Sequence, residues 1–272
     1  MNTECKPEQL EFQSLGRREV MGRFDGGRIT SDGGGLLREQ DRGNPLAASS
    51  TLNRLELGLP ESATSDRYKR IAADSDAMDR LLVDLFLESY RKPPQEIWLD
   101  LDATDDPLHG QQEERFFHGY YRCYCYLPLY IFSGEHLLCA RLRTADKDAS
   151  SGSVDELQRI VGQIRARWPK TRIIIRADAG FCRDAIMAWC EANDVGYVLG
   201  LARNKRLQRA LSKEMEAARL ACECTGEAAR CFRDFRYRTR KSWSCERRVI
   251  GKAEYLPGKA NPRFVVTSLS SN

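Results

Sequence analysis

The spacing of apolar residues divides the chain into predicted helices and strands. Apolar residues recur at intervals of three and four within residues 64–90, which predicts a helix, and Pro93 and Pro94 end it. From Glu96 the period changes to two. Ile97, Leu99 and Leu101 then share one face of a predicted strand, whereas Trp98, Asp100 and Asp102 share the other face.

The same pattern continues through the middle of the chain. Residues 120–132 and 136–142 are apolar and rich in aromatic or β-branched residues, with Gly134 between them, so we predict a hairpin. A helix over residues 154–168, a strand over 171–178, a helix over 182–193 and a strand over 196–201 follow. Helices that alternate with strands after an antiparallel hairpin predict an α/β fold with a mixed sheet.

The two ends of the chain have a different character. Residues 1–53 contain glycine-rich turns around a short β-type run, at 23–39, and a small, polar linker at 41–53. Residues 202–230 are polar and helical, and 231–269 are predicted to form three strands. We therefore expect an N-terminal β-hairpin and helix region with its linker (1–53), a helical segment (54–95), an α/β core (96–200) and a helical and β-rich region (201–272).

Composition narrows the class of protein. The chain has 272 residues, 42% of them hydrophobic and 30% charged, with a net charge of +4, which only weakly favours a polyanionic partner. It has neither an apolar run long enough to span a bilayer nor the apolar segment of a signal peptide, so we expect a cytoplasmic protein with no membrane partner. The ten cysteines are then expected to be free thiols.

Acidic residues are crowded at the end of one predicted strand. Asp100, Asp102, Asp105 and Asp106 fall within seven residues, and Asp178 ends a second predicted strand. The carboxyl ends of neighbouring strands converge in such a sheet, so Asp102 and Asp178 are candidate catalytic residues and metal ligands. A pair of Mg²⁺ ions roughly 4 Å apart would neutralise them and serve phosphoryl transfer. The ordinary alternative is that both aspartates shape turns or cap helices.

A different enzyme class shares part of this pattern. An apolar strand that ends in Asp100, Asp102 and Thr104 also resembles the haloacid-dehalogenase-like phosphatases, in which Asp100 would be the nucleophile and Asp102 the acid and base. That family needs a downstream lysine and a later acidic pair. Asp178 and Asp184 have the wrong spacing, and a hairpin directly after the first strand does not suit that fold.

Basic and aromatic residues alternate in the predicted C-terminal strands. The candidates for contact with a DNA backbone are Arg233, Arg236, Arg238, Arg240, Lys241, Arg247 and Arg248. For any single arginine, a solvated strand face is the simpler interpretation. The cluster as a whole leaves both interpretations open.

Several segments together resemble transposases of the IS1380 group of insertion sequences. They are "LDLDATDDPLHGQQEERFFHGYYRCYCYLPLYIFSGEHLLCARLR", "IIIRADAGFCRD", "YVLGLARN", "FDGGRITSDGGGLLRE" and "STLNRLELG". The resemblance implies an RNase H-like core with a DDE triad, whose first two acids fall on Asp102 and Asp178. It also implies Mg²⁺, for which Mn²⁺ can substitute, and DNA with transposon inverted repeats as the substrate. We expect Asp100 and Thr104 to support the metal site from outside its ligand set.

Two departures from the family pattern affect the expected activity. The region between "GGGLLRE" and "STLNRLE" is shorter than in relatives, and no glutamate matches the third acid, which relatives carry on a helix after "FVVTSL". We therefore expect an internally shortened and C-terminally truncated transposase that lacks strand transfer. The alternative function is a non-catalytic DNA-binding fragment that dimerises with full-length transposase, or with itself, and interferes with transposition.

Overall fold

The computed structural model describes residues 9–15, 18–23, 75–108, 110, 112 and 114–270. The chain forms two compact units, residues 1–78 and 79–272. In the first unit, β1 (Gln9–Leu15) pairs with β2 (Arg18–Arg23) in an antiparallel hairpin. The predicted glycine-rich hairpin at 23–39, the linker at 41–53 and the first part of the predicted helix at 64–90 lie outside the described residues.

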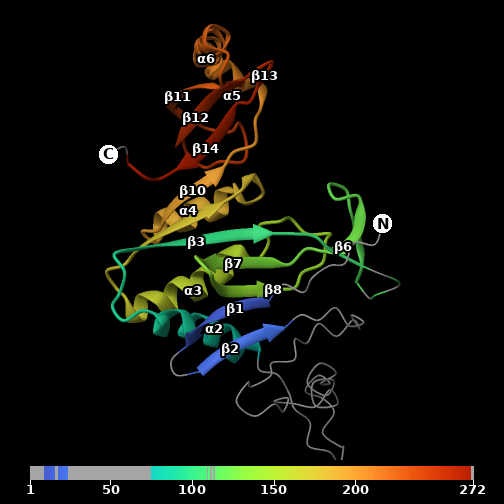
Figure 1. Cartoon of the computed structure of the whole chain (residues 1–272), viewed down its shortest axis with the longest axis vertical. Helices are drawn as coiled ribbons and strands as arrows, with labels where there is room; N and C mark the ends of the chain where they lie inside the picture. The colour runs from blue at the N-terminus through green and yellow to red at the C-terminus, as the bar shows by residue number, and fades with distance from the viewer. Residues whose placement is uncertain are drawn as a thin grey trace, which may run out of the picture. The chain divides into compact units, whose positions relative to one another are not determined.

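A large mixed sheet forms the second unit (Figure 1). Its main strands run in the order β11-β12-β14-β10-β9-β3-β7-β8, and β13 pairs with β12. In chain order they are β3 (Glu96–Ala103), β7 (Leu129–Ser133), β8 (His136–Arg141), β9 (Arg172–Ala177), β10 (Gly196–Gly200), β11 (Ala229–Tyr237), β12 (Arg247–Leu256), β13 (Lys259–Ala260) and β14 (Arg263–Thr267). β3, β9 and β10 are parallel, and the other pairs are antiparallel. The predicted mixed α/β class is therefore confirmed.

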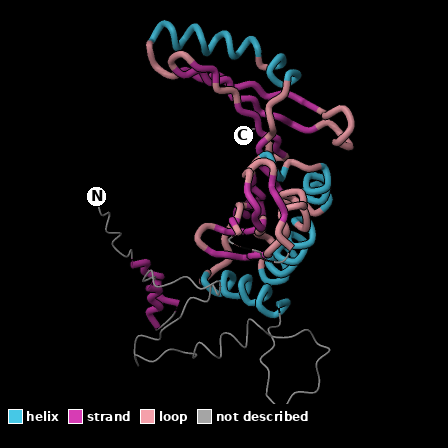
Figure 2. The backbone as a smooth tube through the Cα atoms, turned by 90° about the vertical axis from the view of Figure 1, so that its right-hand side faces the viewer, coloured by secondary structure: helices cyan, strands magenta, loops and turns pink. Residues whose placement is uncertain are grey.

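The helices described from residue 75 onward follow the apolar periodicity. They are α2 (Ser75–Ser89), α3 (Ser153–Arg167), α4 (Asp184–Ala192), α5 (Lys205–Ala210) and α6 (Ser212–Thr225). The apolar stripe of α3, which includes Leu157, Ile160 and Ile164, is fully buried in the main core. Figure 2 shows the helices near the central strands gathered on one side of the sheet.

The two faces of β3 differ as the alternation predicts. Ile97, Leu99 and Leu101 are buried in the core, whereas Trp98 and Asp100 are half-buried and Asp102 is exposed. β9 follows this division only towards its end: Ile173 and Ile175 are buried and Arg176 is exposed, but Ile174, on the face of Arg176, is buried as well. The candidate acids thus lie on the solvent side of a strand whose other side is core.

One predicted strand is two strands in two sheets. The predicted strand at 120–132 divides at Pro128 into β6 (Cys123–Tyr126) and β7. Proline has no N–H to donate, so the ladder is interrupted there. β6 joins β5 (Phe116–His118) and β4 (Asp106–Pro107) in a three-stranded sheet of its own.

The C-terminal strands extend the same large sheet. β14 pairs with β10 through Val198–Thr267, Leu199–Val266 and Gly200–Val265. On one face of β11 and β12, α5 and α6 supply the buried residues Leu207, Leu211, Ala218 and Cys222. Leu211 approaches the Cα of Gly251 so closely that any added Cβ would meet it at 2.8 Å.

Within the described part of the chain, every helix is too short or too polar to cross a lipid bilayer.

Candidate active site

Asp102 and Asp178 lie at the same edge of the sheet. β3 and β9 are adjacent and parallel, and their last registered pair is Leu101 with Ala177. Asp102 and Asp178 each follow directly on that pair, and both are exposed. The structure therefore brings together at two neighbouring strand ends the two acids that the sequence predicts as a pair.

Local hydrogen bonds orient both carboxylates. Asp102 Oδ1 accepts the N–H of Ala103 at 2.9 Å, and Asp178 Oδ1 accepts the N–H of Gly180 at 2.8 Å. Asp178 thereby caps the short helix η1 (Ala179–Phe181). Within the described part of the chain, Oδ2 of each aspartate receives no protein hydrogen bond, so it can accept a ligand.

Gly200 fixes the backbone that carries Asp178. A Cβ on Gly200, at the end of β10, would lie 2.9 Å from the Ala179 nitrogen and 3.1 Å from the Asp178 carbonyl carbon. Both atoms are backbone, so the strand end would have to move. Sequence reasoning did not identify this role of Gly200. Its only signal was a glycine inside an apolar strand, which indicates a close backbone approach.

Asp100 is neutralised by an arginine. Arg176 donates from Nε to Asp100 Oδ1 at 2.6 Å and from Nη2 to Oδ2 at 2.8 Å, and the guanidinium carbon lies 5.7 Å from the centroid of the Trp98 ring. Bidentate charge-assisted pairs of this kind have defined geometry. Both carboxylate oxygens of Asp100 therefore accept hydrogen bonds from Arg176. Asp102 lies two residues further along the strand, and there the described residues bind Oδ1 but leave Oδ2 open.

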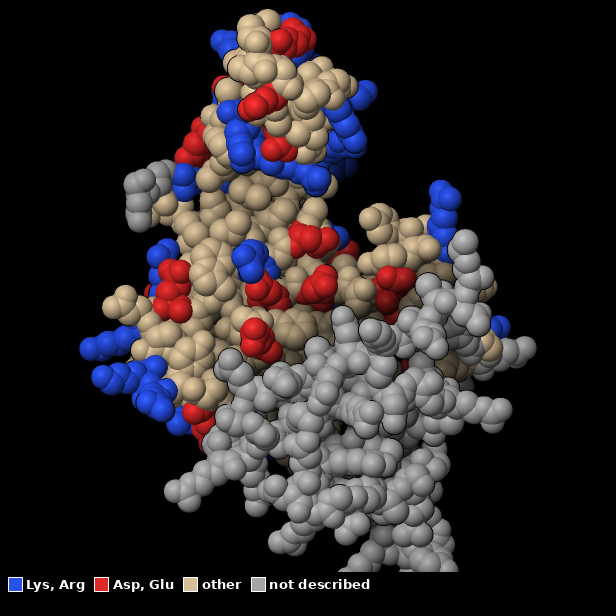
Figure 3. Space-filling model, in the orientation of Figure 1, with Lys and Arg blue, Asp and Glu red and all other residues tan. Residues whose placement is uncertain are grey.

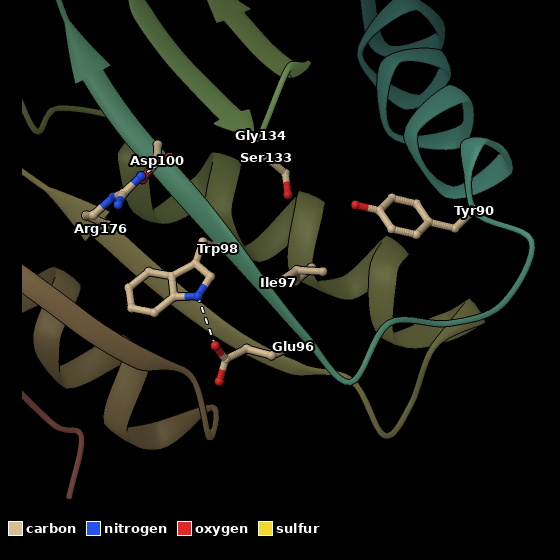
Figure 4. A pocket seen from close by; sticks show the side chains of 8 residues that line it. All are labelled: Tyr90, Glu96, Ile97, Trp98, Asp100, Ser133, Gly134 and Arg176. Carbon is tan, nitrogen blue, oxygen red and sulfur yellow. Dashed lines mark hydrogen bonds and ion pairs between the residues drawn. The ribbon is translucent and has the colours of Figure 1, made fainter. Parts of the chain in front are cut away.

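A cavity of about 360 Å³ adjoins this pair (Figure 4). Trp98, Asp100 and Arg176 line it from the sheet, and Tyr90 lies across from them. The indole N–H of Trp98 donates to Glu96 Oε1 at 2.9 Å, which holds the ring in place. Trp98, Asp100 and Arg176 thus line it from the sheet face that carries Asp102, whereas Ile97 and Ser133, which also line it, belong to the opposite, buried face.

Asp105 and Tyr121 complete the surroundings of the acid pair. The pKa of Tyr121 is raised, mainly because the hydroxyl is partly buried and further because of the negative charges of Asp105, Asp102 and Asp178. The Tyr121 hydroxyl donates to the Ala103 carbonyl at 3.4 Å. Thr104 follows β3 and is exposed. Asp106 and Pro107 form β4 at the edge of the small sheet.

A second acidic loop packs beside Asp178. Partial burial raises the pKa of Asp148, but hydrogen bonds from Arg183 and Ser150 outweigh it and bring the pKa to about 2. The Arg183–Asp148 contact is 2.6 Å long, and Ala149 lies within reach of a Cβ placed on Gly180. The sequence offered no signal for this contact, because the two segments are far apart in the chain.

The donor set suits a hard divalent cation only in part. Exposed carboxylate oxygens at two strand ends are the ligand type that Mg²⁺ prefers. However, no cluster of three or more His, Cys, Asp or Glu side chains with metal-binding geometry occurs in the described residues. The residues present therefore fit a cation held by two carboxylates and solvent.

The predicted basic residues fall into four groups, the last of which is Arg247 alone. Arg236, Arg238, Arg240 and Lys241 are exposed at the end of β11 and in the following turn. Arg233 lies on the opposite face of β11, where it donates to the Ala210 carbonyl and approaches Glu214 at 3.6 Å. Arg248 is half-buried and paired with Asp234 at 2.6 Å. Figure 3 shows Lys and Arg gathered over this part of the sheet, and Asp and Glu gathered over the central strands.

Arg247 does not belong to an exposed basic face. Its side chain is 2% exposed and binds Asp184 at 2.6 Å and Glu191 at 2.7 Å. Its guanidinium carbon also lies 5.8 Å from the centroid of the Trp243 ring. Its guanidinium is thus committed to two carboxylates on α4, and it is not available to a phosphate group.

Comparison with known proteins identifies the family of this chain. No curated protein matches the chain. A family model described as "Transposase DDE domain group 1" matches residues 37–272, which include the whole mixed sheet and both candidate acids. DDE transposases generally use divalent metal ions, bind DNA ends and often form oligomers. With its mixed α/β sheet of the RNase H-like type, the chain belongs to the DDE transposase domain group 1 family.

Proposed function

We propose that this chain is an IS1380-like transposase that cleaves DNA at transposon ends, with Asp102 and Asp178 as its first two catalytic acids. One observation carries the proposal: two exposed aspartates follow the same registered pair of adjacent parallel strands. Membership of the DDE family supports the reaction class.

The residues of the proposed site have three roles: binding the metal ion, neutralising Asp100 and binding the DNA backbone. Asp102 and Asp178 would hold Mg²⁺ or Mn²⁺ through the oxygens that their backbone N–H bonds leave open. A bound ion there would neutralise the two carboxylates and polarise a phosphate oxygen. Arg176 neutralises the charge of Asp100 on the sheet face that also carries Asp102. The supporting role that we propose for Asp100 is to form this ion pair beside the metal ligands. Arg236, Arg238, Arg240 and Lys241 would neutralise backbone phosphates.

Metal binding tests the site directly. We expect Mn²⁺, followed by electron paramagnetic resonance, to bind the full chain, and Asp102→Asn and Asp178→Asn each to abolish that binding. Asp106→Asn is the matched control, because Asp106 is an exposed aspartate close in sequence. Binding that survives both of the first changes would contradict the assignment.

A second candidate function is non-catalytic DNA binding that interferes with an active transposase. It is favoured by the lack, within the described part of the chain, of a third carboxylate that completes a metal cluster with Asp102 and Asp178. Incubation with Mn²⁺ and a plasmid carrying the DNA that flanks the coding sequence separates the two. Nicks that disappear with Asp102→Asn support catalysis, whereas retention of the plasmid in a gel without nicks supports the second function.

A further inference from the structure

The three-stranded sheet next to the acid pair has an exposed aromatic surface. Residues 115–126, which we call the aromatic hairpin, contain six aromatic residues and no Asp or Glu. Tyr120 at its turn is 84% exposed, Phe117 is 56% exposed and Tyr124 is 50% exposed. A soluble domain does not normally cluster large exposed rings without a binding role.

The strand alternation separates an anchored face from an exposed one. Cys125 and Leu127 are buried in a small core with Ala145, against which Tyr121 packs. Phe117 and Tyr124 form a cross-strand pair on the exposed face, with ring centroids 5.5 Å apart. Packing of the anchored face against the body of the protein therefore leaves these two rings pointing outward.

Cations accompany the exposed rings. The Arg115 guanidinium carbon lies 5.3 Å from the centroid of the Tyr124 ring, and Arg122 is exposed near the turn. Aromatic rings interleaved with arginine are the surface on which successive unpaired bases stack, because every base has a π-face and its phosphate is anionic.

The hairpin also stands next to the candidate acids. The rings of Tyr120 and Tyr121 are in edge contact, with centroids 5.1 Å apart. The Tyr121 hydroxyl bonds to the Ala103 carbonyl, beside Asp102. One ring therefore separates the exposed Tyr120 from the strand end that carries Asp102, and a strand bound at the acids would meet the turn of the hairpin.

We propose that the aromatic hairpin binds unpaired bases of the DNA strand that enters the acid site. The inference rests on the proposed function, since it takes DNA as the substrate of this surface. A second copy of the chain is a less suitable occupant. A stable interface uses about 20–30 residues a side, whereas the hairpin has twelve residues and is positively charged.

Three probes of one mixed sequence test the proposal: a blunt duplex, the same duplex with a short single-stranded overhang, and the single strand. We expect the full chain to bind the overhang duplex about ten times more tightly than the blunt duplex, since base–aromatic stacking at even one base suffices for that ratio. The variant Phe117→Ala/Tyr120→Ala/Tyr124→Ala should lose the preference. The matched control Leu81→Ala/Leu142→Ala/Leu220→Ala removes three exposed apolar side chains elsewhere and should keep it.

Equal preference in the wild type and the hairpin variant, or none in the wild type, would overturn the inference. Because the triple change can impair folding, the single change Tyr120→Ser at the turn is measured in parallel, and it should lower the preference by a smaller factor. Mn²⁺ binding by the hairpin variant separates the two proposals. If the variant still binds Mn²⁺ and still prefers the overhang duplex, the proposed metal site is retained and only the role of the hairpin is refuted. Self-association that is absent from the variant, without any change in DNA preference, would assign the surface to a second copy and also overturn the inference.

Discussion

At the scale of single residues, the crowded aspartates are distinguished by their partners. Among the described residues, Asp100 is bound bidentately by Arg176, whereas Asp102 and Asp178 each accept only a neighbouring backbone N–H. Unlike charges at short range favour the ionised carboxylate, and like charges oppose it. Arg176 therefore keeps Asp100 from adding uncompensated charge beside Asp102, and two carboxylates remain open to a cation.

Replacing Gly200 with alanine should damage the site without touching either aspartate. The new Cβ would lie 2.9 Å from the Ala179 nitrogen, so the backbone beside Asp178 must shift. We expect Mn²⁺ affinity to fall and the free energy of unfolding to drop by about 1–3 kcal/mol, as in other overpacked positions. Gly162→Ala on α3 is the control, because no atom lies within 4 Å of its Cβ. Titration with Mn²⁺ and urea unfolding measure both effects, and normal affinity in Gly200→Ala would refute the positioning role.

The placement of Asp102 and Asp178 at neighbouring strand ends could be predicted from the sequence, whereas the contacts around them could not. Strand alternation put Asp102 on the solvent side, and parallel strands put Asp178 at the same edge. The Asp100–Arg176 pair depends on the register between two strands that are 76 residues apart in sequence, and no local pattern encodes it. The close approach at Gly200 depends on the path of η1, which follows from tertiary packing.

At the scale of elements, the buried Arg247 ties β12 to α4. It binds Asp184 and Glu191, and Glu191 also accepts the Tyr197 hydroxyl at 2.8 Å. Ser244 donates to Asp184 from its backbone N–H at 2.9 Å. This network explains why an arginine in a basic stretch turned out to be structural. Alternation along β12 places Arg247 on the inner face, and α4 supplies the two charges that it needs.

Arg247→Met should destabilise the second unit. Removal of one partner of a buried ion pair leaves charge uncompensated. We expect a loss of roughly 3 kcal/mol, near the lower end of the usual range because both carboxylates keep contact with solvent. Arg219→Met is the control, since Arg219 makes its ion pairs with Glu216 and Glu223 on the surface of α6. Urea unfolding at neutral pH should show a large effect for the first change and a small one for the second.

The same network should make stability depend on acid pH. Burial raises the pKa of Asp184 and of Glu191, but hydrogen bonds outweigh it, from Ser244 and Arg247 to Asp184 and from Arg247 and Tyr197 to Glu191, so both pKa values are lowered. A group with a lowered folded-state pKa contributes its stability fully above its unfolded pKa, about 4, and loses it as the pH falls through the folded value. The free energy of unfolding should therefore decline below about pH 4 more steeply in the wild type than in Arg247→Met. Parallel curves for the two proteins would contradict this.

The exposed basic turn after β11 should make DNA binding sensitive to salt. Arg236, Arg238 and Arg240 are exposed there. Changing all three to alanine should reduce the slope of log K against log salt by about 0.9 for each phosphate that the protein no longer neutralises. The control is Arg219→Ala on α6, because Arg219 is already ion-paired with Glu216 and Glu223. If both variants keep the wild-type slope, the basic turn is a solvated face without a role in DNA binding.

At the scale of the whole second unit, the β-rich C-terminal region and the α/β core share one sheet. The sequence predicted the strands of both regions, but it placed a segment boundary at residues 200 and 201. The structure runs across that boundary: β14 pairs with β10, Leu201 donates to the Phe264 carbonyl at 2.8 Å, and buried Thr267 donates to the Tyr197 carbonyl at 2.8 Å. Pairing between strands distant in the chain has no local signature, so periodicity could not reveal it.

This continuity predicts that residues 96–268 unfold as one cooperative unit. The ladder β12-β14-β10-β9-β3 links the strand paired with β11 to the strand that carries Asp102, and Val266 on β14 is fully buried. A local loosening at Val266 should reduce packing on both sides, because buried residues of both regions belong to the same main core. We expect Val266→Ala to lower the protection of amides in β11 and β12 and in β3 and β9 by the same free energy, roughly 2 kcal/mol. Hydrogen exchange followed by mass spectrometry at increasing urea measures this. Early exchange in β11 and β12 alone, while β3 and β9 stay protected, would mean that the C-terminal strands form a separate folding unit, and that the basic turn is not held rigidly to the strands that carry the acids.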